Sequence, residues 1–237
     1  MTTEEANALL TSVDDLGFLS PEKTDMLLGA IGAMPPIQKR AAVSKLTQTR
    51  MSAGGHNLSS RDEAMMRLGM LPAPIRDGLA GKRLQLADTV FYIVKAAGTS
   101  TTVKMITNAD LKSVGVSNLP NGKLDKDNYF LLTHVRLVSG VSEKGGVDVS
   151  FGVPEKSIVN GQVEFKVGTK YLLPNEFGLS VFDTTNKSDV LAGMFRLSSP
   201  KWIEPQQQLE FNMDLAKIAA PDTWIRVELH GSSVIPF

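Results

Sequence analysis

The chain has 237 residues, with 25 Lys and Arg against 25 Asp and Glu, so its formal net charge is zero. A neutral chain is poorly suited to bind nucleic acid through bulk charge. The absence of cysteine excludes a disulfide framework, a thiolate metal site and a cysteine nucleophile. No apolar run approaches the roughly 18 residues of a membrane helix, and the acidic start lacks the basic stretch of a signal peptide. We therefore expect a globular protein with no membrane span.

The composition changes near residue 85. Residues 1–86 contain seven of the ten Met but only one of the fifteen aromatic residues, Phe18. Ala, Leu and Met favour helices, whereas aromatic and β-branched residues favour strands. The change predicts two parts, a helical N-terminal region over residues 1–84 and a β domain over residues 87–237.

Four short helices are expected in the N-terminal region. The first carries an apolar stripe at helical spacing, with Ala6, Leu9, Leu10 and Val13 on one face. A second spans about 20–34, a third about 37–51, and a fourth begins at Ser59 or Ser60 and ends before Pro72. The stripe of the fourth comprises Ala64, Met65 and Leu68. Because such short helices are unstable in isolation, they must pack on each other, on the β domain or on a neighbouring chain.

Beyond Leu86 the apolar pattern has a period of two, which is typical of half-buried strands. We predict nine or ten strands, at 89–95, 102–106, 129–138, 147–151, 162–167, 177–181, 194–197, 208–213 and about 225–230. Asn160–Gly161 is predicted to form a hairpin turn. The predicted core comprises Val163, Phe165, Leu209, Phe211, Ile225, Val227 and Leu229.

No segment of the β domain resembles a helix long enough to connect parallel strands, so an antiparallel β-sandwich is expected. A jelly roll fits the strand number best, and a Greek-key sandwich of another topology is the alternative.

Candidate metal ligands are few. His56, His134 and His230 do not form an H-x-H pattern, so they are interpreted as ordinary surface or edge histidines in preference to a metal site assembled in space. Asp125 and Asp127 alternate in a loop and could hold Ca²⁺, but their turn-forming neighbours favour a solvated turn. Motifs of a serine hydrolase, a phosphate loop or a dinucleotide fold are absent. We expect neither an enzyme nor a cofactor.

Two tryptophans are candidate contact residues. Trp202 and Trp224 could stack on sugars, or could pack in the core or at a subunit interface. The second interpretation is favoured because aromatic residues dominate both environments.

Charge is segregated along the N-terminal region. Residues 1–30 carry six acids and one base, whereas residues 31–86 carry nine bases and three acids. The candidate contacts to nucleic acid are Lys39, Arg40, Lys45, Arg50, Arg61 and Arg67. The alternatives are that acidic and basic helices pair within or between chains, or that both are solvated. We therefore expect nucleic-acid binding to be weak or indirect.

The last third of the chain has a distinctive series of segments. They are Asn160–Gly161 with QVEFKV, Tyr171–Pro174, Phe195–Leu197, Pro200–Pro205 with Leu209–Phe211, and Trp224–Gly231. This series resembles the C-terminal half of the jelly-roll coat proteins of tailless icosahedral bacteriophages and similar viruses, and the resemblance covers residues 87–237.

The resemblance implies a virion structural protein that assembles with copies of itself into a closed shell, in a host cytoplasm, with other virion proteins as further partners. The N-terminal region would lock neighbouring subunits or face the interior. It departs from the strongly basic arms common in such proteins, because its charge is mixed. The alternative is a receptor-binding or carbohydrate-binding β-sandwich module with an N-terminal docking segment.

Overall fold

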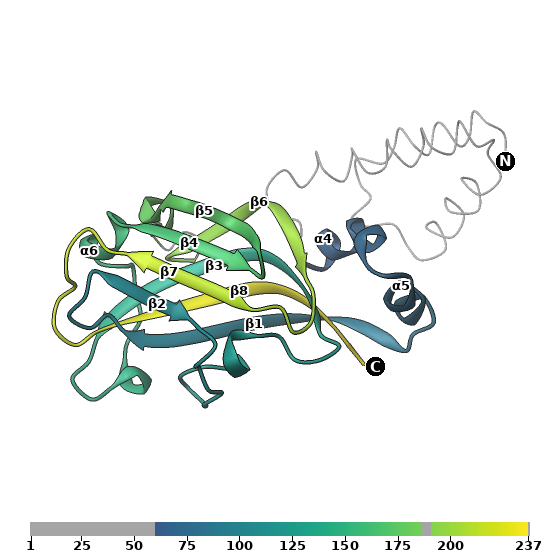
Figure 1. Cartoon of the computed structure of the whole chain (residues 1–237), viewed down its shortest axis with the longest axis horizontal. Coiled ribbons are helices and arrows are strands. Elements are labelled where there is room, and N and C mark those ends of the chain that lie inside the picture. Colours follow the sequence, from purple (N-terminus) through teal and green to yellow (C-terminus); the bar gives the residue numbers. More distant parts are fainter. Residues whose placement is uncertain (1–59, 186–190, 237) are drawn as a thin grey trace. The chain divides into compact units, whose positions relative to one another are not determined.

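The computed structural model describes residues 60–185 and 191–236, and residues 60–237 form one compact unit. The first three predicted helices lie outside the described residues. The described part contains eight strands in two four-stranded antiparallel sheets, which pack face to face (Figure 1). The predicted boundary between a helical and a β part, at residues 84–87, stays a prediction.

The first sheet has the order β1 (Leu84–Ala96), β8 (Thr223–Pro236), β3 (Tyr129–Val141) and β6 (Met194–Ile203). The second has the order β2 (Thr102–Ile106), β7 (Leu209–Asp214), β4 (Gln162–Val167) and β5 (Lys170–Gly178). Orders 1-8-3-6 and 2-7-4-5 are those of two interlocked Greek keys, which define the jelly roll. The predicted fold class is confirmed.

The helices of the described part are all short. They are α4 (Ser60–Met66), η2 (Leu68–Met70), α5 (Ala73–Ala80), η3 (Pro120–Gly122), η4 (Gly146–Asp148), α6 (Lys156–Val159) and η5 (Leu179–Phe182). None of these helices has the length and apolar character needed to cross a bilayer. Helix α4 begins at the predicted Ser60, but α5 was not predicted. Pro72 and Pro74 were read as stop signals, whereas they flank the first residue of α5, where a proline loses no helical hydrogen bond.

The core lies between the two sheets, where the predicted alternation places it. All seven predicted core residues are buried. Aromatic pairs reinforce both halves of the core: the ring centroids of Phe91 and Phe130 are 4.9 Å apart, and those of Phe165 and Phe211 are 5.3 Å apart. Strand β3, expected to be central, lies between β8 and β6.

Two predicted strands are wrong. Residues 147–151 form no strand, because Gly145 (φ 114°) turns the chain and Gly146 packs against the ring of Trp224. Val147, expected to face a core, is 68% exposed. Residues 177–181 also differ from the prediction, because β5 ends at Gly178 and η5 follows it.

The predicted hairpin at Asn160–Gly161 is wrong as well. Asn160 caps the end of α6, and Gly161 lies so close to Asp214 that a Cβ there would be 2.3 Å from the carbonyl oxygen of that residue. Glycine is thus required for close approach and not for a turn. The turn between β4 and β5 contains Gly168 (φ 58°) instead.

Candidate functional site

The outer face of the first sheet carries a continuous network of charged side chains. Strand β8 alternates, so that Ile225, Val227 and Leu229 face the core while Arg226, Glu228 and His230 face outward. The register places Arg136 of β3 opposite Glu228, and His134 opposite His230. Residues about 90 positions apart in sequence therefore form one cluster.

Glu228 is the centre of this network, and its side chain is only 7% exposed. Its carboxylate accepts a hydrogen bond from Arg136 Nη1 at 3.1 Å and one from His230 Nε2 at 3.0 Å, and it forms an ion pair with Arg226 Nε at 2.7 Å. Burial alone would raise the pKa of Glu228, but His230, Arg136 and Arg226 together lower this pKa to about 2. The carboxylate is therefore ionised at neutral pH and holds two strands together.

The histidine pair extends the network toward β6. The Thr133 hydroxyl donates to the backbone carbonyl of His230 at 3.0 Å, so it accepts from His134 Nδ1 at 2.9 Å. Burial lowers the pKa of His134, and the charges of Arg196 and His230 lower it further. His134 is therefore neutral at pH 7, with its proton on Nδ1. The expectation that His230 ends a strand is wrong, since β8 continues to Pro236.

Helix α4 is fixed to this sheet by a second buried carboxylate. Glu63, whose side chain is 6% exposed, pairs with Arg67, the residue that follows α4, and with Arg196 Nη2 of β6 at 2.7 Å. The indole N–H of Trp202 donates to the backbone carbonyl of Arg67 at 3.1 Å. Arg67, a predicted nucleic-acid contact, is thus engaged in seating α4 on β6.

Segment 65–70, seated in this way, carries three exposed methionines, which we call the Met cluster. Met65, Met66 and Met70 are 55%, 40% and 70% exposed. Met65 lines a groove of about 420 Å³ whose apolar lining also includes Leu68, Leu79, Leu84 and Leu86, with Arg76 and Lys82 among its polar residues. An exposed apolar surface of this kind is typical of a contact site.

A second apolar surface, which we call the Val cluster, is formed by Val114 and Val147. These side chains are 96% and 68% exposed, and Gly115 lies directly against Val147. The ring of Trp224 packs on Gly146, the residue before Val147, and its indole N–H donates to the backbone carbonyl of Ser142 at 3.0 Å.

The two clusters lie toward opposite ends of β1. Gly78, beside the Met cluster, packs on Leu84 at the start of this strand, and Gly146, beside the Val cluster, packs near Val94. Ten residues of strand separate Leu84 from Val94, which corresponds to about 33 Å.

The remaining predicted sites differ in outcome. Lys39, Arg40, Lys45 and Arg50 lie outside the described residues, as does His56, and the side chain of Arg61 is not described.

Asp125 and Asp127 lie in a turn closed by the Asn128 amide, and within residues 60–185 and 191–236 no three His, Asp or Glu residues form a metal-binding group. Trp202 and Trp224 are partly buried, and each supports a segment that bears one apolar cluster.

The comparisons with known proteins give a structural similarity but no match in sequence. No protein-family model matches the chain, and no curated protein matches it. Among solved structures, the cyanophage Pam1 capsid asymmetric unit aligns with a TM-score of 0.27 and 16% identity, covering 65% of this chain and 86% of that chain. A similarity at this level supports no conclusion about function.

Proposed function

We propose that this protein is a structural component of a virion, without enzymatic activity, whose jelly-roll domain assembles with copies of itself into a closed icosahedral shell. The helical N-terminal region would lock neighbouring subunits or face the interior. The protein would reside in the virion and, during assembly, in the host cytoplasm, with other virion proteins as further partners. Contact with nucleic acid would be weak or indirect.

The observation that carries the proposal is the pair of exposed apolar clusters toward opposite ends of one domain. Met65 of the Met cluster lines a groove, whereas Val114 lies in a loop with 96% of its side chain exposed. A projecting apolar group and an apolar groove at different places on one molecule make a heterologous contact between copies. Contacts of this type propagate from copy to copy and close into rings or shells when the geometry permits.

The support beneath both clusters fits this role. The Met cluster is seated on β6 through Glu63 and Trp202, and Gly146, the residue before Val147, packs on Trp224. Side chains presented on a rigid base lose little conformational freedom on binding, which favours association.

The test uses disulfide cross-linking between copies, for which the cysteine-free chain is a clean background. Chains carrying Met65→Cys are mixed with differently tagged chains carrying Val114→Cys, and the mixture is oxidised during assembly. We expect a disulfide between the two tagged chains, because Met65 lines the groove. The matched control replaces Val114→Cys with Tyr171→Cys, a half-exposed residue of neither cluster, and should not cross-link. Large assemblies without the disulfide between positions 65 and 114 would reject this contact, and a chain that stays monomeric would reject the function itself.

A second candidate function, a carbohydrate-binding module, is favoured by a polar pocket on the outer face of the second sheet.

A further inference from the structure

A polar pocket lies on the outer face of the second sheet, where β2, β7 and the loop after β2 meet. It has a volume of about 230 Å³, and six of its seven lining residues are polar. They are Lys104, Thr107, Asn108, Gln208, Glu210 and Asn212, with Ile106 as the seventh. Alternation along β7 directs Gln208, Glu210 and Asn212 away from the core while Leu209 and Phe211 are buried.

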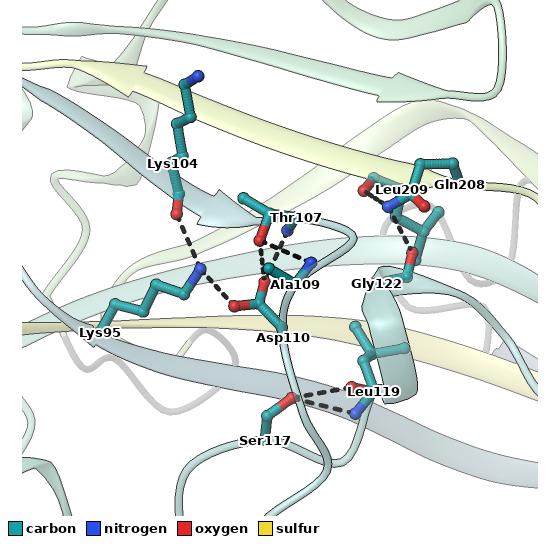
Figure 2. Close-up of polar contacts among 10 residues, drawn as sticks. All are labelled: Lys95, Lys104, Thr107, Ala109, Asp110, Ser117, Leu119, Gly122, Gln208 and Leu209. Carbon is teal, nitrogen blue, oxygen red and sulfur yellow. Dashed lines mark hydrogen bonds and ion pairs between the residues drawn. The ribbon is translucent and has the colours of Figure 1, made fainter.

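The loop that closes the pocket is held by one carboxylate. Asp110 accepts hydrogen bonds from the backbone N–H of Thr107 at 2.6 Å and from its hydroxyl at 3.0 Å, and it pairs with Lys95 Nζ at 2.6 Å (Figure 2). Lys95 also donates to the carbonyl of Lys104 at 3.0 Å, so the loop is tied to β1 and β2 together. The wall of the pocket is therefore formed before any ligand arrives.

A second support lies at the other side of the pocket. The Gln208 side-chain amide donates to the carbonyl of Leu209 at 2.9 Å and to that of Gly122 at 3.4 Å. Gly122 (φ 61°) approaches Thr107 so closely that a Cβ would be 2.5 Å from its carbonyl oxygen. Figure 2 shows the Lys104 ammonium pointing away from the Lys95–Asp110 pair. Lys104 is thus not engaged by that carboxylate.

Four of the lining side chains have polar groups available for a ligand. Lys104, Asn108, Glu210 and Asn212 make no side-chain hydrogen bond or ion pair with any other residue in the part of the chain that the structure describes. Together they offer an ammonium, a carboxylate and two amides, which supply both donors and acceptors. The single positive charge and the single negative charge cancel.

From this set of groups we infer that the pocket binds a neutral glycan. Each sugar hydroxyl can donate one hydrogen bond and accept others. Neighbouring hydroxyls can therefore bond to amide groups and to a carboxylate that lie side by side. A phosphate or another anion would be repelled by Glu210, a metal ion would find only one carboxylate, and an apolar ligand would find only Ile106. The inference is independent of shell assembly, since the pocket belongs to neither apolar cluster.

The experiment is saturation-transfer NMR and calorimetric titration on the full chain. The probes are maltotriose, cellotriose, mannotriose and the N-acetylglucosamine trimer, with sialyllactose and inorganic phosphate as anionic comparisons. We expect at least one neutral trisaccharide to bind, and neither anionic comparison to bind more tightly. Asn212→Ala and the isosteric Glu210→Gln should each weaken binding about tenfold, because each removes hydrogen bonds to the ligand. Gln162→Ala, an exposed position on β4 outside the pocket, is the matched control and should leave the affinity unchanged.

Three results would overturn the inference: no binding of any of the four neutral trisaccharides, tighter binding of phosphate or sialyllactose, or neutral binding that neither pocket variant weakens. Assembly can be measured on the same samples, so a failure here is distinguishable from a failure of the proposed function.

Discussion

The outer faces of the two sheets use charged residues in opposite ways. On the first sheet, Glu228 of β8 is buried and paired with arginines, as is Glu63 of α4, which pairs with Arg196 of β6. On the second sheet, Lys104 and Glu210 are exposed and carry no partner in residues 60–185 and 191–236. Charge on the first face therefore stabilises the fold, whereas Lys104 and Glu210 on the second face are available for recognition. Substitutions on the two faces should therefore be detected by different measurements.

The largest expected effect is that of Glu228→Ala. This substitution leaves Arg136 and Arg226 without their common carboxylate, and removing one partner of a buried ion pair costs about 3–5 kcal/mol. The measurement is the free energy of unfolding from urea titration. The matched control is Glu164→Ala on the second sheet, where the pair with Lys166 (2.7 Å) is more exposed and should cost less than about 1 kcal/mol. Equal costs at the two positions would remove the distinction between the faces.

A smaller effect is expected for Glu63→Gln. The neutral amide keeps the size of the side chain but weakens its pairs with Arg67 and Arg196, which should cost about 1–2 kcal/mol. Because the change is local, hydrogen exchange should accelerate in residues 60–70 while β3 and β8 stay protected. Asp77→Asn, an exposed carboxylate on α5, serves as the control. Unchanged exchange in α4 would show that Glu63 does not anchor the helix.

The smallest effect concerns pH. The pKa of His134 in the folded state is lowered from 6.5 by burial and by the charges of Arg196 and His230, with Glu63 opposing. The unfolded chain therefore binds the proton more readily, and stability should decline as pH falls below 6.5. The measurement is the midpoint of thermal unfolding as a function of pH. In the His134→Gln variant, the shallow decline of this midpoint below pH 6.5 should be absent.

A steeper loss of stability at lower pH should remain in the His134→Gln variant. The pKa of Glu228 is lowered from 4.5 to about 2, so its contribution is complete above pH 4.5 and is lost as pH falls toward 2. A decline below pH 6.5 that persists unchanged in His134→Gln would contradict this assignment.

Much of the fold could be predicted because it depends on local pattern. Strand β2 has the predicted bounds, and the alternation in β7 and β8 identified the buried face, since a period of two is visible in one strand. Segment 147–151 shows the limit of this signal: its alternation is real, but no neighbouring strand pairs with it along its length. Turn residues were ambiguous for the same reason, as Gly161 serves close approach and not a hairpin.

The charged network could not be predicted. Glu228 and Glu63 appear in the sequence as ordinary polar residues of a strand and a helix. Arg136, the partner of Glu228, comes from β3, which the order 1-8-3-6 places beside β8, whereas Arg196, the partner of Glu63, comes from β6, on which α4 packs. Trp202 and Trp224 were found because tryptophan is rare and large, yet the segments that they support depend on tertiary contacts.

The central claim, assembly into a closed shell, is tested most directly by electron microscopy of the purified full-length chain, with its mass measured by light scattering. We expect closed particles of uniform diameter, and we expect the double substitution Met65→Asp with Val114→Asp to leave folded subunits that do not form them. Apolar burial drives these contacts, so particles should persist between about 50 and 200 mM salt. A folded chain that stays a monomer or a small oligomer under all these conditions would contradict the claim.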